Sequence, residues 1–165
     1  MDASAQTVSL RRLRRGERHP VVTVFAGLSE RSRRLRFLAP VHRLTERQLD
    51  TLVDVGCCGR EALVASEADT GRPIGIGRYV RDDHHPETAE VAFAVVDAWQ
   101  GRGVGRRLAL ELARVARAAG VTRLRATVAS ENRAAVALLQ RVGTVEHTVR
   151  DGATMELTLS LTRPR

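Results

Sequence analysis

The chain has 165 residues, of which 43% are hydrophobic and 28% are charged, a length and a balance typical of one globular domain. We therefore expect a single domain over residues 1–165. No run of about 18 apolar residues is present, and the N-terminus has no apolar signal-peptide region. These absences exclude a transmembrane helix, and they predict a cytoplasmic protein with no membrane partner.

The charge is strongly positive, with a formal net value of +8 at pH 7, and all 27 basic residues are arginines. Such a charge attracts anions, including nucleic acids, acidic surfaces and phosphorylated ligands. The arginines are scattered along the chain, and aromatic residues make up only 3% of it, too few for a base-stacking surface. We therefore expect no nucleic acid partner; the alternative, a nucleic-acid-binding protein, predicts a contiguous basic face.

The first third of the chain predicts one strand followed by helices. Residues 7–13 alternate enough for a strand. Residues 19–38 predict one helix or two short ones, with Pro20 near a helix start. Thr45 is followed three residues later by Gln48, which is the spacing of a capping box, so another short helix is expected to begin there.

The middle of the chain predicts three strands. Residues 61–67 and 73–80 have strand character, and residues 81–87 carry turn residues. Residues 88–96 form the strongest strand candidate. A glycine-rich stretch follows, and then the apolar spacing of a helix up to about residue 119.

The last segments predict a strand at residues 123–129 and a helix from a Ser130 cap to about Val142. Residues 143–161 predict a hairpin that turns around Asp151 and Gly152. Two parallel-type strand–helix–strand crossings, over residues 88–129 and 123–149, thus follow an antiparallel front half. The fold class is α/β (α+β), a mixed sheet with helices on its faces.

The glycine-rich stretch predicts an anion-binding loop. A strand that runs into Gly101, Gly103 and Gly105 and then into a helix presents backbone N–H groups at the helix N-terminus, where phosphate binds well. Arg102 and Arg106 would add positive charge at its mouth; the alternative is a tight turn without a ligand. The glycine spacing does not fit a Rossmann fingerprint, and a Walker loop needs a lysine, which the chain lacks.

The stretch QGRGVG, residues 100–105, resembles the Q/R-x-x-G-x-G/A motif of the GNAT (GCN5-related N-acetyltransferase) superfamily. Gln100, Gly103 and Gly105 stand at its defining positions. The resemblance extends over residues 88–143 and includes an N-x-x-A pattern that begins at Asn132. The segments SERSRRLRFL and REALVA are similar to bacterial protein lysine acetyltransferases of this superfamily.

This resemblance implies the GNAT fold, a mixed, mostly antiparallel sheet of six or seven strands flanked by about four helices and splayed between its fourth and fifth strands. It also implies acetyl-CoA as co-substrate. The pyrophosphate would lie on the glycine-rich backbone, and the pantetheine arm would pair with the fourth strand. The implied cofactor-binding residues are Phe93, Ala94, Val95, Gly101, Arg102, Gly103, Val104, Gly105, Arg106 and Asn132.

Glu90 is the candidate catalytic base. It stands in the middle of a predicted strand, on the face shared by Ala92 and Ala94, where we expect it to be partly desolvated and its pKa to rise. It also matches by position the base glutamate of several GNAT enzymes. The alternative is an edge glutamate that faces solvent or pairs with an arginine.

The general acid stays unassigned. Many family members carry a tyrosine seven residues after the motif asparagine, and that position is Leu139 here. Tyr79, the only tyrosine, is a weak substitute. The resemblance further implies that a backbone N–H near Val95 stabilises the oxyanion. The adjacent Cys57 and Cys58 have no metal-ligand spacing, and we expect no metal.

These features predict an acetyl-CoA-dependent N-acetyltransferase that moves an acetyl group to a primary amine by direct attack in a ternary complex. Protein lysine is the first expected acceptor and a small-molecule amine the second. Because Leu139 replaces the usual tyrosine, a non-catalytic acyl-CoA-binding sensor module is a further alternative. The resemblance also implies that the chain could pair as a homodimer.

Overall fold

The computed structural model describes residues 8–161, and no helix among them is long and apolar enough to cross a membrane. In chain order the elements are β1 (Val8–Arg12), α1 (Arg18–Ala26), α2 (Glu30–Phe37), α3 (Glu46–Val53), β2 (Arg60–Glu67), β3 (Pro73–Arg81), β4 (Thr88–Val95), the 3-10 helix η2 (Asp97–Trp99), α4 (Val104–Ala118), β5 (Arg123–Ala129), α5 (Arg133–Val142), β6 (Thr144–Asp151) and β7 (Thr154–Ser160). Each predicted strand and helix is present, although Thr7, at the start of the first predicted strand, lies outside the described residues. The segment 19–38 forms two helices.

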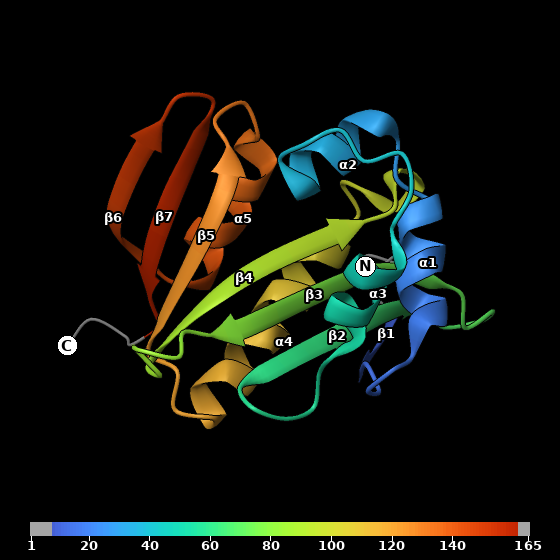
Figure 1. The fold of residues 1–165 in the computed structure, drawn as a ribbon, viewed down its shortest axis with the longest axis horizontal. Coiled ribbons are helices and arrows are strands. Elements are labelled where there is room, and N and C mark those ends of the chain that lie inside the picture. Colours follow the sequence, from blue (N-terminus) through green and yellow to red (C-terminus); the bar gives the residue numbers. More distant parts are fainter. Residues whose placement is uncertain (1–7, 162–165) are drawn as a thin grey trace, which may run out of the picture.

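The seven strands form one sheet in the order β1-β2-β3-β4-β5-β7-β6 (Figure 1). Only β4 and β5 pair in parallel; the other neighbours are antiparallel. The expected mixed and mostly antiparallel α/β sheet is therefore confirmed. The described residues contain five α-helices, one more than expected.

The second predicted crossing differs from a simple strand–helix–strand unit. β5 and β6 both run antiparallel to β7, so they point in the same direction, but β7 lies between them. The hairpin places its second strand next to β5 because that strand alternates buried apolar residues, whereas β6 is mostly exposed. The edge position therefore goes to the more polar strand.

Apolar clusters cover both faces of the sheet. α4 packs on one face through Leu108 and Leu112, both at most 1% exposed. Gly77 on β3 leaves space for the ring of Phe93 on β4, because a β-carbon there would lie 2.8 Å from that ring. On the other face, under α1 and α3, a smaller cluster contains Leu13, Val21, Leu49, Val53, Val55, Ala62 and Val64.

Helix caps explain where two of the helices begin. The predicted capping box is confirmed at α3: the hydroxyl of Thr45 accepts from the N–H of Gln48, and the Gln48 side chain accepts from the N–H of Thr45. The predicted Ser130 cap is wrong. Ser130 stays bound to the β6–β7 hairpin through Ala153, and Asn132 caps α5 by accepting from the N–H of Ala135 at 3.1 Å.

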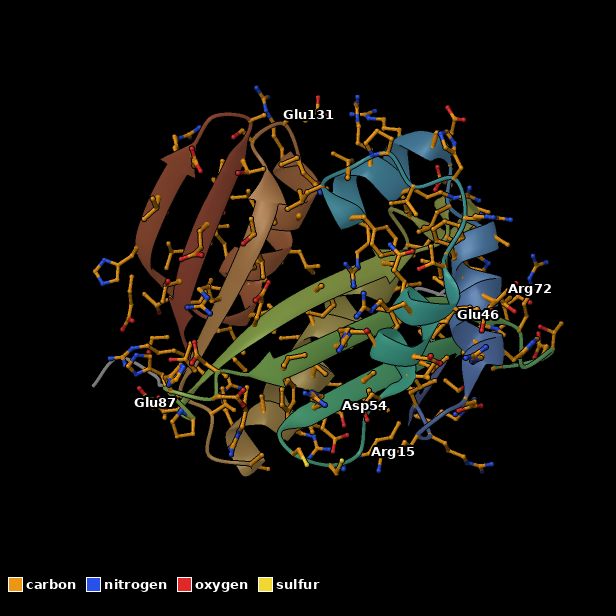
Figure 2. All side chains as sticks on the ribbon, in the orientation of Figure 1. Arg15, Glu46, Asp54, Arg72, Glu87 and Glu131 are labelled. Carbon is orange, nitrogen blue, oxygen red and sulfur yellow. The ribbon has the colours of Figure 1, made fainter. Side chains whose placement is uncertain are left out.

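Charges of both signs surround the molecule, as the labelled side chains of Figure 2 show. Arg15 pairs with Asp54 at 3.1 Å, and Arg34 pairs with Glu131 at 3.3 Å. This mixed surface counts against the contiguous basic face that a nucleic-acid-binding protein would show.

Candidate active site

β4 and β5 run side by side only at their beginnings. Their pairing ends at Glu90↔Arg125, although β4 continues to Val95 and β5 to Ala129. Beyond that pair the strands separate, as Figure 1 shows. The predicted splay between the fourth and fifth strands is therefore confirmed, and it begins one residue after Glu90.

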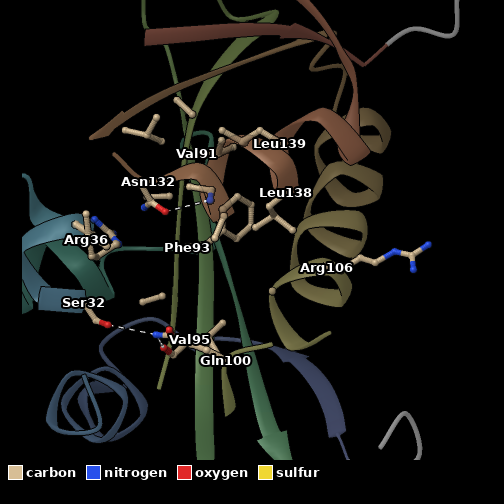
Figure 3. Close-up of a pocket in the computed structure, with 18 of the residues that line it drawn as sticks. Ser32, Arg36, Val91, Phe93, Val95, Gln100, Arg106, Asn132, Leu138 and Leu139 are labelled. Atoms are coloured by element: carbon tan, nitrogen blue, oxygen red, sulfur yellow. Dashed lines mark hydrogen bonds between the residues drawn. The ribbon is translucent and has the colours of Figure 1, made fainter. Parts of the chain in front are cut away.

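A cavity of about 330 Å³ occupies this gap. Its walls come from β4, β5, α2, α5 and the glycine loop, which we define as residues 100–105 (Figure 3). The predicted cofactor-binding residues that line it are Phe93, Ala94, Val95, Gly101, Gly103, Gly105, Arg106 and Asn132. The structure thus brings together one strand, one loop and one helix start that the sequence singled out.

The backbone of β4 faces the gap at alternate residues. The N–H of Val96 donates to the carbonyl of Ile74 on β3 at 2.9 Å. Because N–H directions alternate along a strand, the N–H groups of Phe93 and Val95 point the other way, toward the side where β5 has separated. They can therefore pair with an extended ligand in the gap.

The start of α4 is open to an anion. Gly103 is its N-cap, with a left-handed φ of 81° and no side-chain cap. The first N–H groups of the helix thus keep their hydrogen-bonding capacity, and the helix dipole adds positive potential there. The side chain of Val104 is 1% exposed and belongs to the core, so only its backbone could contact a ligand.

The two arginines of this segment do not direct their side chains into the cavity. The guanidinium of Arg102 lies 5.1 Å from the ring centroid of Trp99, and Arg102 is not among the lining residues. Arg106 lines the cavity, but its side chain extends away from the other labelled residues in Figure 3. We expected positive charge at the mouth, yet the backbone contributes more of the site than these side chains do.

A hydrogen-bond network that the sequence did not reveal ties α2 to the glycine loop. The amide of Gln100 donates to the carbonyl of Val95 at 3.0 Å and to the hydroxyl of Ser32 at 3.3 Å. The N–H of Ser29 donates to Asp97 at 3.1 Å. The motif had marked Gln100, but its partner Ser32 lies 68 residues away in sequence, so spacing alone gives no signal for this contact.

Glu90 lies at the base of the fork between β4 and β5, on the same face of β4 as Ala92 and Ala94. It is exposed rather than partly desolvated as expected. It does not line the 330 Å³ cavity. In residues 8–161 it forms no ion pair within 4.0 Å. Its catalytic role stays a prediction.

Arg36 lines the cavity from α2, and sequence reasoning missed it. Figure 3 shows it on the same side of β4 as Asn132. Burial, reinforced by the nearby charge of Arg78, lowers the pKa of Arg36 to about 10, while Glu90 acts in the opposite direction. The gap therefore contains a guanidinium from the front half of the chain.

Neither expected position supplies a phenol acid. Leu139, 2% exposed, lines the cavity where many relatives would carry tyrosine. Tyr79 is also 2% exposed and does not line this cavity, and burial raises its pKa. Tyr79 is therefore a core residue, and the weak prediction that it acts as the acid is not supported.

The part of the chain that the structure describes contains no cluster of residues that could bind a metal ion. Among residues 8–161, His, Cys, Asp and Glu do not gather in any group of three that could hold an ion. Cys57 and Cys58 are free thiols in the loop before β2. The expectation of a metal-free site stays a prediction.

Comparisons with known proteins agree with this geometry. The sequence model of the Acetyltransferase (GNAT) family matches residues 32–144. Acetyltransferase Pat of Mycolicibacterium smegmatis is 36% identical over 105 residues, which are 64% of this chain and 32% of Pat. The chain thus spans about a third of the length of this curated relative.

Two solved structures share the fold. The GNAT domain of S. lividans PAT superimposes with a TM-score of 0.83 at 27% identity, over 93% of this chain and 90% of that one. yncA from Salmonella typhimurium, a putative acetyltransferase solved with its cofactor acetyl-CoA, has a TM-score of 0.73 at 20% identity over 96% of each chain. At that identity, the second structure shows the fold alone.

The matched family segment runs from α2 to the start of β6, and it contains the splayed strands, the glycine loop and the asparagine cap of α5. The resemblance found in the sequence is thereby confirmed. The chain belongs to the GNAT family of acetyltransferases.

Proposed function

We propose that this chain transfers the acetyl group of acetyl-CoA directly to a primary amine, within a ternary complex, and that the amine is the side chain of a protein lysine. The observation that carries the proposal is the open gap between β4 and β5 with Glu90 at its base. The similarity to Acetyltransferase Pat and to the GNAT domain of S. lividans PAT supports the lysine assignment.

The donor fits the residues that line the gap. The start of α4 has no side-chain cap, so its N–H groups could bind a pyrophosphate. The N–H groups of Phe93 and Val95 point into the gap, where they could pair with the amides of a pantetheine arm. When bound, acetyl-CoA supplies an activated acetyl thioester. The carbonyl of Val95 is occupied by Gln100, so the N–H of Val95 is the group that is free to act on a ligand in the gap.

The acceptor amine must lose a proton before it can attack, since an ammonium has no lone pair. Glu90 stands in the last residue pair before the strands separate, and it would accept this proton directly or through one water. The N–H of Val95 would donate to the developing oxyanion. No tyrosine stands at Leu139, so water would protonate the departing thiolate.

The test replaces Glu90 with glutamine and measures thiol release from acetyl-CoA in the presence of a lysine peptide. Removal of a general base typically slows a reaction by about 100-fold or more, so we expect kcat/KM to fall by that factor while the affinity for acetyl-CoA is kept. Glu87→Gln, three residues earlier and outside the cavity, is the matched control and should keep its rate. An unchanged rate in Glu90→Gln would remove Glu90 as the base.

The same assay separates the alternatives. Thiol release with small amines but not with lysine peptides would favour a small-molecule acetyltransferase. Tight binding of acetyl-CoA without thiol release in any acceptor mixture would favour the acyl-CoA-binding sensor.

A further inference from the structure

A second, smaller cavity of about 40 Å³ adjoins the β4–β5 gap. The two cavities share Leu28, Arg36 and Ala94 as lining residues, so the small cavity opens on the face of β4 that also carries Glu90. Apart from two arginines, its walls are apolar: Val21, Val24, Phe25, Leu28, Phe37, Leu44, Leu52, Ile76 and Ala94.

The two arginines reach this cavity from different elements. Arg36 comes from α2, and Arg78 comes from β3. In the sheet, Arg78 pairs with Ala92 and the next β3 position on that face pairs with Glu90. Arg78 and Glu90 are therefore diagonal neighbours on one face, roughly 7 Å apart at the backbone.

Neither guanidinium forms an ion pair with a carboxylate of residues 8–161, and the charge of Glu90 acts on both only from a longer distance. No hydrogen bond or ion pair joins Arg36 or Arg78 to any described residue, and the Nε of Arg78 is fully buried without an acceptor. The guanidinium carbon of Arg36 lies 4.9 Å from the ring centroid of Phe37. Burial lowers the pKa of Arg78 as it does that of Arg36.

This pattern is unlike that of most other arginines near the sheet. Arg11, Arg60 and Arg125, for example, each pair with a carboxylate. Buried nitrogens without an acceptor also occur on Arg33 and Arg81, but Arg33 donates to the carbonyl of His42, and Arg81 lines neither cavity. Two unpaired cations in one apolar cavity cost free energy, and a bound anion would offset that cost.

We propose that Arg36 and Arg78 together bind a carboxylate of the acceptor, so that the preferred substrate is an amine with a negative charge close to it. This inference rests on the proposed function, because it takes Glu90 to mark the position of the amine. Paired guanidiniums are well suited to a carboxylate because their N–H groups match its two oxygens. The short path from Arg78 to Glu90 limits the carboxylate to the amine's own molecule or to a residue next to the target lysine.

The carboxylate has two sources, and two matched pairs of acceptors separate them. Free lysine and lysinamide differ only in the α-carboxylate. Two capped peptides, one with aspartate and one with asparagine next to the lysine, differ only in the flanking charge. Calorimetry in the presence of coenzyme A measures the binding of each acceptor, and thiol release from acetyl-CoA measures its turnover.

We expect the anionic member of at least one pair to bind about tenfold more tightly or better, and Arg36→Gln and Arg78→Gln to reduce that preference to less than about threefold. Arg31→Gln, an exposed position on the same helix, should keep the full preference. Because neither guanidinium is paired, Arg36→Met and Arg78→Met should not lower Tm; a large fall in Tm would indicate a structural role instead.

Equal binding of both members of each pair by the wild-type chain would overturn the inference, as would a preference that survives in both glutamine variants. A carboxylate preference without thiol release would uphold the inference and contradict the proposed transfer. Thiol release that is equal for the neutral and anionic members of both pairs would contradict the inference and uphold the proposed transfer.

Discussion

At the scale of single residues, Gly103 links backbone conformation to donor binding. Its φ of 81° is strained for any residue with a β-carbon, and it stands where we propose that the backbone approaches a pyrophosphate. Gly103→Val should therefore raise the Kd for coenzyme A by about tenfold or more. Gly71→Val, at a φ of 70° in the turn before β3, imposes similar strain far from the loop and is the control.

The comparison of these two variants by calorimetry separates strain from binding. If both variants lose the same stability and only Gly103→Val loses affinity for coenzyme A, the result would support the assignment of the glycine loop to pyrophosphate binding. Unchanged affinity in Gly103→Val would contradict it.

The sequence identified residues that line the cavity on its proposed donor side, but it missed the two arginines that we propose for the acceptor side. Val95 and Gly103 belong to one sequence segment and Asn132 belongs to a second, and the spacing within each segment is local. Arg36 stands in an arginine-rich helix whose sequence predicts exposure to solvent, and only tertiary packing places it in a cavity. Arg78 did leave a signal: it shares a strand face with Ile76, where a charge is unexpected.

At the scale of elements, Glu17 fixes the junction between β1 and α1. It accepts from the guanidinium of Arg11 at 2.6 Å and from the N–H of Arg14 at 3.0 Å. The side-chain hydrogen bonds from Arg11 outweigh desolvation, and with the bond from Arg14 they lower the pKa of Glu17 from 4.5 to about 2. A carboxyl whose pKa is lower in the folded than in the unfolded state stabilises the folded state fully at pH values above its unfolded-state pKa. That contribution is lost as the pH falls through the folded-state pKa.

Glu17→Gln should therefore lower the free energy of unfolding by about 0.5–1 kcal/mol at pH 7, as is typical for a partly exposed ion pair. The difference from the wild type should shrink between about pH 5 and pH 2. Urea titrations across this range measure it, with Asp83→Asn, an exposed position, as control. A difference that stays constant with pH would show that the ion pair is not its source.

The elements themselves were predictable where the local signals agreed. The capping box at Thr45 and the alternation of β4 were sufficient to place α3 and β4. The start of α5 was placed two residues early, because Ser130 and Asn132 are both good caps and only the pairing of Ser130 with the hairpin decides between them. The order of β6 and β7 also depended on burial across the finished sheet.

At the scale of the molecule, two apolar clusters share one sheet, and we predict that they unfold together. Trp99, the only tryptophan, packs against the larger cluster, so its fluorescence reports the α4 face, while far-UV circular dichroism reports the whole chain. Both signals should follow one cooperative transition. Leu108→Ala, at a position that is 0% exposed, should shift both equally and cost about 3 kcal/mol.

Two separate transitions would contradict the expectation of a single domain. The expectation would also be contradicted if Leu108→Ala shifted the fluorescence transition but not the circular dichroism transition. Val22→Ala, on the exposed side of α1, is the control and should change stability little.

The hydrogen-bond network between α2 and the glycine loop, which acts as a tether, has a consequence for how each substrate affects the binding of the other. Ser32, which contacts Gln100, and Arg36 lie four residues apart, one turn along the same face of an eight-residue helix. Any ligand that fixes the loop therefore also restricts the helix that carries a guanidinium of the second cavity. By thermodynamic linkage, coenzyme A and the acceptor should each increase the affinity for the other by the same factor, and cutting the tether with Ser32→Ala should bring that factor toward one.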